Sequence, residues 1–337
     1  MAAHDSTSSV VAGIDIGGTK LSVCVGDSQG RVLAHERWPM DRDAEPTDLL
    51  GEALRWLERL DAAHRPVALG VACPGPLTLA GRFLDPPNMP RWHGFDVASW
   101  LRAQQALPVH TMNDANAAVV AEVWWGAARG ARNAVFCTMS TGMGAGLWLN
   151  GALHPGKGGF GGEIGHIRLA DDGPVGFGKR GSVEGFLSGP GMSQVGVAEA
   201  RVALQRGEAS ALLYHGAPRA DLDAEVLCRL AASGDPAALR AVRRSAEKLG
   251  SLLAILVDLL DLEVAVLGTI GSAHLDLFLP GALEVLRAEA LRHSLAGFEV
   301  VGSTLGARRG DLQALAAACY GELGPSASRE ASGASGA

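Results

Sequence analysis

Residues able to handle a phosphate crowd into one N-terminal stretch, GIDIGGTKLSVCVGDSQGRVL. Gly17 and Gly18 carry no Cβ and can adopt a positive φ, so their N–H groups can face a bound phosphate at close range. Thr19 and Lys20 add a hydroxyl and a positive charge. Asp15 ends the preceding apolar run, where a carboxylate can hold a hydrated Mg²⁺ beside the phosphates. The stretch therefore suggests a phosphate-binding turn.

An ordinary β-hairpin, whose two glycines only form the turn, is the alternative explanation of this stretch. The stretch is not a P-loop, because the G-x-x-x-x-G-K-[ST] spacing is absent and a strand pattern follows it instead of a helix. Two further glycine-rich segments bear on the choice between these interpretations.

The second glycine-rich segment, STGMGAG, can present backbone amides and hydroxyls to a phosphate from Thr141, Gly142 and Gly144. A glycine hairpin is again the alternative. The third segment, LGTIGS, ends a buried strand, and Gly268 and Gly271 would allow close approach of a flat ring such as adenine. Three such segments at strand ends favour a nucleotide site over three coincidental turns.

Acidic and amide side chains occur in two other places. In NDANAA, Asn113 and Asp114 follow a strand and start a helix, so Asp114 either caps that helix or accepts a proton from a hydroxyl that attacks a phosphoryl group. In GGEIGHIRL and GSVEGFLSG, Glu163, His166 and Glu184 form a set suited to hydrogen-bonding a polyhydroxylated substrate. A structural role is the alternative for the histidine.

Alternating apolar patterns predict the elements that must position these residues. Three strands at 10–15, 21–26 and 31–37 form an antiparallel meander, and a helix follows at 47–63. Buried strands are expected at 66–73 and 109–112. The pattern then restarts with NAVFCTMS and GAGLWLNG, which indicates two α/β lobes with a cleft between them. We expect lobes at 10–113 and 114–320, with the last helix able to pack back on the first lobe, and disordered ends at 1–9 and 321–337.

Composition limits the classes of function. The 337-residue chain has a formal charge of -7 and no basic run, which argues against a nucleic-acid surface. Its five cysteines are widely spaced, without a C-x-x-C pair, so neither a disulfide framework nor a cysteine zinc site is expected. The apolar run at 249–268 contains three acidic residues and predicts a buried helix and strand, not a membrane span. With a polar N-terminus that is unlike a signal peptide, these features predict a cytoplasmic protein.

The ordered set of motifs resembles the ROK family (repressor, open reading frame, kinase). The resemblance covers about 10–320 and rests on DIGGTK, PGP, NDANAA, STGMGAG, GGEIGH and the late glycine turn. It implies an actin-like (ribonuclease H-like) ATPase fold of α/β class, with two lobes, often dimeric, in which ATP and a sugar meet in the cleft. The repressors of the family carry a helix-turn-helix region before the first motif, for which the short leader here leaves no room.

The resemblance also implies roles for individual residues. Asp114 would be the catalytic base. The sugar would be held by residues of five segments: Gly75; Asn88; Asn113 with Asp114; Glu163 with His166; and Glu184. The nucleotide would be bound by three sets of residues: Asp15, Gly17, Gly18, Thr19 and Lys20; Thr141, Gly142 and Gly144; and Gly268 and Gly271. Asp15 would approach Mg²⁺ through water.

The sequence departs from the family at its zinc motif. Family members with zinc carry a histidine followed by C-x-C-G-x-x-G-C-x-E, but alignment on Glu184 places Val175, Phe177 and Ser182 at the three cysteine positions. We therefore expect no structural zinc, and we expect packing by Phe177 and the neighbouring glycines to hold this loop.

These features predict an ATP- and Mg²⁺-dependent hexose kinase, with glucose as the expected substrate and glucose 6-phosphate as the product. The alternative enzymes are an N-acetylhexosamine kinase, a fructokinase and a glucokinase that uses polyphosphate. A sugar-sensing or scaffold protein is the alternative of another class, but such a protein has no need of a proton acceptor at Asp114. A homodimer without nucleic-acid or membrane partners is expected.

Overall fold

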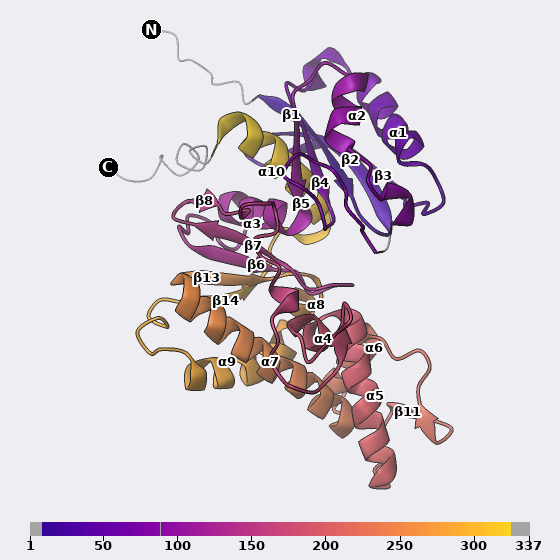
Figure 1. Ribbon diagram of the computed structural model, residues 1–337, viewed down its shortest axis with the longest axis vertical. Coiled ribbons are helices and arrows are strands. Elements are labelled where there is room, and N and C mark those ends of the chain that lie inside the picture. The colour runs from indigo at the N-terminus through magenta and orange to yellow at the C-terminus, as the bar shows by residue number, and fades with distance from the viewer. Residues whose placement is uncertain (1–8, 88, 325–337) are drawn as a thin grey trace. The chain divides into compact units, whose positions relative to one another are not determined.

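The computed structural model describes residues 9–87 and 89–324, and these form two compact α/β units that interleave along the chain (Figure 1). Unit 1 comprises the chain up to Gly130, the segment Gly146–Gly161 and the chain from Thr304 onward, whereas unit 2 comprises Ala131–Ala145 and Gly162–Ser303. Asn88 and most of the two expected disordered ends lie outside the described residues.

Unit 1 is built on a five-stranded sheet with the order β3-β2-β1-β4-β5. The strands are β1 Val10–Ile16, β2 Lys20–Asp27, β3 Val32–Pro39, β4 Leu69–Cys73 and β5 Val109–Asn113. The first three are antiparallel, which confirms the predicted meander, whereas β4 and β5 run parallel to β1. The strand predicted at 66–73 begins three residues later than expected.

Strand register brings three of the predicted motifs to one edge of this sheet. Asp15 on β1 is paired with Ala72 on β4, and Cys73 is paired with Asn113 on β5. Because parallel strands end at the same edge, the residues that follow β1, β4 and β5 emerge together. This edge carries the glycine turn, the PGP segment and the NDANAA segment.

The two faces of the sheet are covered by different helices (Figure 1). One face holds apolar residues such as Ile14 and packs against α1 Pro46–Glu58 and α2 Val97–Gln104. The other face packs against α10 Arg309–Leu323, for which Gly70 leaves room, since a Cβ there would overlap the α10 backbone. Asp15 alternates with Ile14 along β1 and thus points toward α10.

Two helix boundaries differ from expectation. The first helix ends at Glu58, and only a 3₁₀ turn at Ala62–His64 follows, where the sequence predicted a continuous helix to residue 63. Helix α10 continues to Leu323, past the expected start of the tail at Gly321. It does so because Gly321 packs against the His110 ring and Glu322 lies 2.7 Å from His110 Nε2.

The chain crosses to unit 2 after Gly130, later than the boundary expected near Asn113, because α3 Asp114–Trp125 packs against α10 in unit 1. A hairpin of β7 Ala145–Leu149 and β8 Ala152–Leu153 follows further along the chain. Its turn residues Asn150 and Gly151 have φ of 55° and 80°, the combination that favours a two-residue hairpin.

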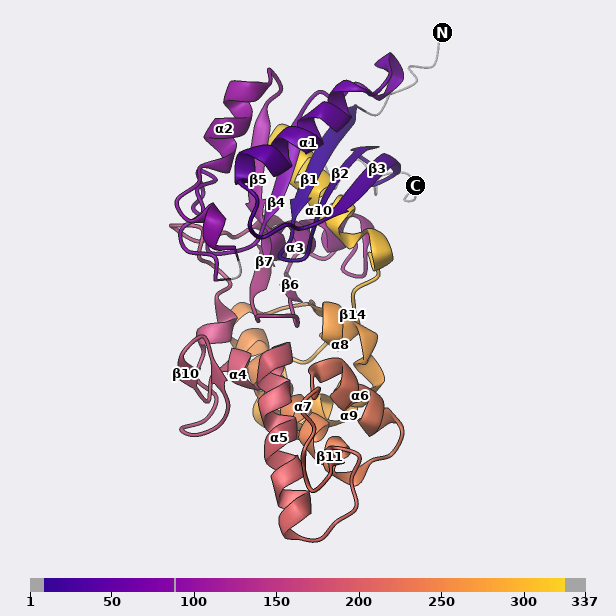
Figure 2. The same ribbon diagram turned by 90° about the vertical axis from the view of Figure 1, so that its right-hand side faces the viewer.

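Unit 2 contains three parallel strands, ordered β14-β13-β6, with the helices α5, α6, α7 and α9 packed on one another (Figure 2). The strands are β6 Ala134–Cys137, β13 Val264–Leu267 and β14 Glu299–Gly302. The helices are α4 Val183–Leu187, α5 Gly189–Gln205, α6 Ala224–Ala232, α7 Pro236–Leu260, α8 Thr269–Ala273 and α9 Leu275–Glu289. Two short hairpins add β9 Val175–Gly176 with β10 Lys179–Arg180, and β11 Leu213–Tyr214 with β12 Ala217–Pro218.

The long apolar run at 249–268 forms the end of α7 and all of β13, as predicted. Helix α7 stops at Asp261, whose left-handed φ of 50° ends the helix before the strand begins. Across the ranges that the structure describes, no helix is long and apolar enough to cross a membrane. All five cysteines are buried and free of disulfides.

Candidate active site

Asp15 is a buried carboxylate at the sheet edge of unit 1. Its exposed fraction is only 7%. Burial, followed by the charge of Asp114, raises the pKa of Asp15 from its ordinary value of 3.8 to about 7. Lys20 and Arg309 lower this pKa, and Asp311 raises it further. The charges of Asp114 and Asp311 therefore act on Asp15 in one direction, and those of Lys20 and Arg309 act on it in the other.

Asp311 is a buried acidic residue that the sequence analysis did not single out. It is fully buried in the first turn of α10, accepts a 3.1 Å hydrogen bond from Ser22 Oγ and lies 3.4 Å from His35 Nδ1. The preceding residue, Gly310, packs against Asp15. A Cβ on Gly310 would overlap the Asp15 carboxylate. The sequence carried only a weak signal, because an aspartate in a first helical turn is ordinarily exposed.

The glycine turn after β1 is closed by its own backbone. The N–H of Gly17 donates to the carbonyl of Lys20 at 2.9 Å, and the carbonyl of Thr19 accepts from Met40 N–H at 2.9 Å. Neither Gly17 nor Gly18 has a positive φ, so neither uses the conformational freedom that its type allows. The turn closes without a positive φ at either glycine, and the N–H of Gly17 already donates to the Lys20 carbonyl. A Cβ on Gly18, in contrast, would point into open space.

Asn113, not Asp114, is the N-cap of α3. Its Oδ1 accepts from the N–H of Ala115 at 3.0 Å and of Asn116 at 3.4 Å, while Asp114 is the first helical residue. Oδ1 of Asp114 also accepts from Ala115 N–H, at 2.7 Å. Because Asn113 supplies the cap, helix capping is a poor explanation for the carboxylate at position 114.

Gly75 and Asn113 are neighbours, as two of the residues predicted to hold a sugar should be. A Cβ on Gly75 would lie 3.3 Å from Asn113 Nδ2. A cavity of about 270 Å³ within unit 1 reaches Asn113 and runs along β5 past Thr111 to Tyr320. Unit 1 thus combines an amide, a carboxylate and a small cavity at the ends of β4 and β5.

The second glycine segment was predicted at 140–146, and most of it lies in the loop 138–144 between β6 and β7, which is tied to neighbouring helices. Thr138 Oγ1 accepts from Gly144 N–H at 2.8 Å, and Ser140 N–H donates to Gly142 O at 3.1 Å. The carbonyl of Ser140 accepts from Gly189 N–H at 2.7 Å. These contacts fix the loop and leave Thr141 exposed at its tip.

Glu163, His166 and Glu184 lie together in unit 2. Oε2 of Glu184 accepts from Met143 N–H at 3.1 Å, which joins the glycine loop to α4. The pKa of Glu163 is raised because neighbouring protein desolvates its carboxyl and Glu184 repels it, while His166 acts in the opposite direction. Glu163 and His166 are nevertheless exposed, so both side chains are accessible to a ligand.

The segment that replaces the zinc motif is the hairpin of β9 and β10. Phe177 sits at its tip with a left-handed φ of 45° and contacts the His166 ring edge-on, with 5.3 Å between ring centroids. Ser182 caps α4 by accepting from Gly185 N–H at 3.1 Å. Lys179 Nζ donates to the His166 carbonyl at 2.6 Å. The hairpin thus holds His166 through packing and hydrogen bonds.

The glycines of the third segment are explained by packing within unit 2. A Cβ on Gly268 would overlap the Phe136 ring, and a Cβ on Gly271 would overlap Met139 Sδ. The absence of side chains at these two positions therefore does not itself point to a bound ring. A role in nucleotide binding remains a prediction for both.

The carboxylates of unit 1 fit Mg²⁺ only as a hydrated ion. Within the described parts of the chain, no three His, Cys, Asp or Glu side chains converge as a ready metal site. Mg²⁺ usually keeps several waters and binds through one or two carboxylates plus substrate phosphates. Asp15, with Asp114 near it, suits that arrangement because a divalent cation would offset the local excess of negative charge.

Comparisons with known proteins agree with the order of the motifs. A family model described as ROK family matches residues 11–318. The glucokinase of Streptomyces coelicolor is 30% identical over 259 residues, covering 76% of this chain and 80% of that protein. The N-acetylmannosamine kinase of Salmonella typhimurium is 34% identical over 281 residues, covering 82% and 86%. The crystal structure of a ROK family glucokinase from Streptomyces griseus, in complex with glucose and AMPPNP, has a TM-score of 0.69 and 26% identity, covering 90% and 97%.

The chain belongs to the ROK family. Its fold is the α/β, actin-like ATPase fold of the ROK sugar kinases, which confirms the expected fold class. As a ROK sugar kinase, it is a phosphotransferase that acts on an alcohol group.

Replacement of Gly18 by Val tests the phosphate turn of this ROK protein. Because a Cβ there meets no protein atom, the variant should melt like the parent and keep its sugar affinity. The added methyl groups would obstruct an approaching phosphate, and we expect ATP affinity to fall at least about tenfold by calorimetry. Unchanged ATP affinity in the folded variant would identify the turn as an ordinary hairpin. Gly17 is less suitable, because a Cβ there would lie 3.0 Å from Lys20 O.

The free energy of unfolding of Asp15→Asn tests whether the buried Asp15 carboxylate destabilises the folded protein. With a folded-state pKa of about 7 against an unfolded value of 3.8, the folded state binds the proton more tightly, so this group makes stability fall as pH rises from about 4 through 7. The asparagine variant should therefore be more stable than the parent at pH 8, by about 2–4 kcal/mol, and similar to it near pH 4. Urea unfolding at both pH values measures the difference, and a variant less stable at pH 8 would contradict it.

Elemental analysis tests the replacement of the zinc motif. The three aligned thiolate positions are Val175, Phe177 and Ser182, and one remaining histidine cannot close a four-ligand structural site. We expect no stoichiometric zinc in the purified protein and an unchanged melting temperature after EDTA. A content of about one zinc per chain, or unfolding by the chelator, would show that another ligand set exists.

Proposed function

We propose that this ROK kinase transfers the γ-phosphoryl group of ATP to the 6-hydroxyl of glucose. The observation that carries the proposal is the grouping of Asp15 and Asp114 at the ends of parallel strands, close enough for the charge of one to raise the pKa of the other. One carboxylate next to a cation and one next to the sugar are what phosphoryl transfer to an alcohol requires.

In the proposed mechanism, Asp114 accepts the proton of the sugar hydroxyl as that oxygen attacks the γ-phosphorus. Gly75 and Asn113 would position the sugar from unit 1, as would Asn88. Glu163, His166 and Glu184 would bind further hydroxyls from unit 2, since carboxylates and imidazole accept hydroxyl hydrogen bonds.

The donor side would use the glycine turn after β1 and the loop of unit 2. Lys20 would offset phosphate charge, while the N–H of Gly18 and the loop residues Thr141, Gly142 and Gly144 would contact phosphate oxygens. Asp15 would hold the waters of Mg²⁺, which when bound would supply positive charge next to the phosphates. Gly268 and Gly271 would lie next to adenine. The Streptomyces griseus relative, whose structure contains AMPPNP, supports ATP as donor.

Glucose is favoured as substrate because the Streptomyces coelicolor and Streptomyces griseus relatives are glucokinases. The N-acetylmannosamine kinase of Salmonella typhimurium has slightly higher identity and makes an N-acetylhexosamine the second candidate. We also propose that the protein is a cytoplasmic homodimer, which sedimentation of the purified protein would test.

A matrix of acceptors and donors tests the assignment. Glucose, N-acetylmannosamine, N-acetylglucosamine and fructose would each be incubated with ATP or with polyphosphate, and phosphorylated products identified by mass spectrometry. We expect the highest kcat/KM for glucose with ATP. A tenfold preference for another sugar, or for polyphosphate, would overturn that part of the proposal. Sugar binding without turnover under every condition would indicate a sensing protein.

Asp114→Asn tests the proposed base. An amide cannot take the hydroxyl proton, so kcat should fall about 10²- to 10⁴-fold with little change in sugar affinity. Asp96→Asn is the matched control, because Asp96 caps α2 through Ser99 N–H at 2.9 Å and lies outside the proposed machinery. Both variants should melt like the parent. Turnover within about threefold of the parent rate would remove Asp114 from the mechanism.

A further inference from the structure

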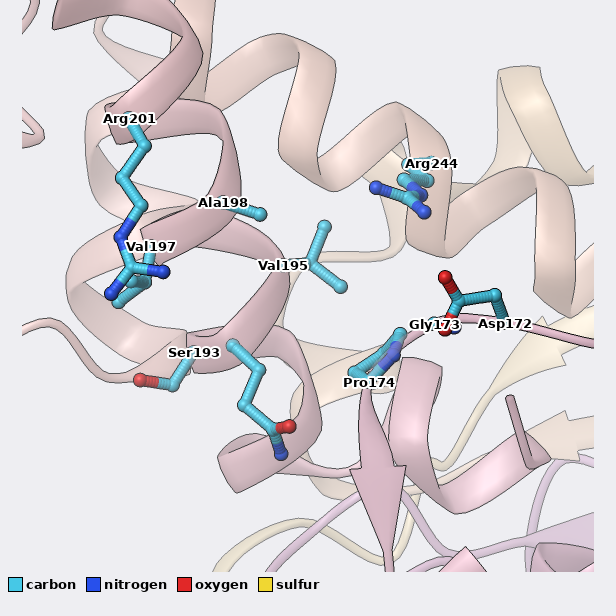
Figure 3. Close-up of a pocket in the computed structure, with 10 residues that line it drawn as sticks. Asp172, Gly173, Pro174, Ser193, Val195, Val197, Ala198, Arg201 and Arg244 are labelled. Atoms are coloured by element: carbon cyan, nitrogen blue, oxygen red, sulfur yellow. Dashed lines mark hydrogen bonds between the residues drawn. The ribbon is translucent and has the colours of Figure 1, made fainter. Parts of the chain in front are cut away.

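A second cavity, of about 540 Å³, lies in unit 2 on the side of α5 that faces α7 (Figure 3). Arg201 of α5 and Arg244 of α7 line it from two different helices. Val195 and Ala198 project between these two arginines in Figure 3. The wall opposite α5 is the segment 172–174, which leads into the β9–β10 hairpin.

The two arginines of this cavity lack the acidic partners that four other arginines of unit 2 have, namely Arg180, Arg219, Arg240 and Arg243. In the described part of the chain, neither Arg201 nor Arg244 forms a salt bridge. Arg240, one turn before Arg244 on α7, is paired with both Glu199 and Glu208, at 3.1 and 2.9 Å. Arg244 instead lies over the Phe186 ring, 5.8 Å from its centroid.

The one carboxylate that lines the cavity is already neutralised. Asp172 accepts from Gly173 N–H at 2.9 Å and from Arg180 Nη1 at 3.1 Å. These bonds, and to a smaller extent the charges of Arg180 and Arg244, lower its pKa. Lys248 adds a further positive charge next to Phe186, with Nζ 5.5 Å from the ring centroid. The cavity therefore has an excess of positive charge, although the chain as a whole is acidic.

The lining also has a substantial apolar part. Val195, Val197 and Ala198 supply methyl groups from α5, and Pro174 closes the opposite side. Gly173, with φ of 146°, packs directly on the buried Phe186 ring, where a Cβ would overlap the ring. Guanidinium groups beside an apolar wall suit an anion that carries a carbon skeleton, and planar guanidinium groups match phosphate oxygens in particular.

We propose that this cavity binds a small phosphate monoester and that occupation of the cavity alters sugar binding. The charge would be held by Arg201 and Arg244, and the carbon skeleton would lie against Val195 and Ala198. This site is separate from the proposed nucleotide residues. Its binding reaction does not depend on kinase activity, whereas its effect on sugar rests on the function proposed above.

The β9–β10 hairpin connects the cavity with a residue of the proposed sugar site. Gln194, which also lines the cavity, holds both backbone groups of Val175: its Oε1 accepts from the N–H at 3.0 Å and its Nε2 donates to the carbonyl at 2.9 Å. Two residues further on, Phe177 contacts the His166 ring. A ligand that moves the 172–174 segment would thus shift the β9–β10 hairpin that follows it, and with it the Phe177 ring that contacts His166.

Calorimetry with glucose 6-phosphate, inorganic phosphate and glucose, on the full-length protein, tests the binding. The double variant Arg201→Gln/Arg244→Gln is compared with Arg206→Gln, an exposed arginine of the same region that does not line the cavity. We expect the parent and Arg206→Gln to bind glucose 6-phosphate alike, and the double variant to bind it at least about tenfold more weakly at this site. Glucose should bind all three proteins equally when no phosphate is present.

If the double variant and the parent bind glucose 6-phosphate equally, the ligand does not bind in this cavity. That result would overturn the proposal. Inorganic phosphate that binds as tightly as the ester would overturn the assignment of a carbon skeleton to the apolar wall. For the coupling, glucose affinity is measured in Asp114→Asn without ATP, so that no phosphoryl transfer occurs, with and without saturating glucose 6-phosphate. A change of glucose affinity in that protein that disappears when Arg201→Gln/Arg244→Gln is added supports the coupling, and its persistence contradicts it.

Discussion

Burial of the Asp15 carboxylate at the end of β1 is the constraint on which the rest of unit 1 depends. A buried carboxylate is costly unless it is compensated, and here the charges of Asp114 and Asp311 add to that cost. Lys20 and Arg309 offset it only in part. The arrangement suits the proposed binding of a cation at this position, because a cation would offset the repulsion among these carboxylates.

The fold keeps Asp15 in this place through close packing of α10 on the sheet. Gly13, Gly26 and Gly70 clear the path of the helix, whose first turn then meets the carboxylate through Gly310. The same sheet edge presents Gly75, Asn113 and Asp114 because β4 and β5 are parallel to β1. In unit 2, two hydrogen bonds fix the glycine loop: Glu184 accepts one from Met143 N–H, and Gly189 N–H donates the other to the Ser140 carbonyl.

The sequence predicted the meander and the strands β4 and β5, because these follow from local periodicity. That Gly75 and Asn113 would serve one site was implied only by the resemblance to the ROK family. The sequence could not predict contacts between residues far apart in the chain, such as those between Asp15 and α10 or between Phe177 and His166. Glycine was the least informative residue. Gly17 and Gly18 avoid the positive φ that their type suggested, and Gly268 and Gly271 make room for Phe136 and Met139.

The ionisation of Asp15 in the ligand-free and ligand-bound protein tests this account most directly. Carbon-13 NMR of the labelled aspartate carboxyls, assigned with Asp15→Asn, would follow its titration. The account predicts a pKa of about 7 in the free protein, and a clear decrease when Mg²⁺ and a non-hydrolysable ATP analogue bind, because the added cation favours the carboxylate. An ordinary pKa near 3.8 in the free protein, or a raised pKa that the ligands leave unchanged, would contradict it.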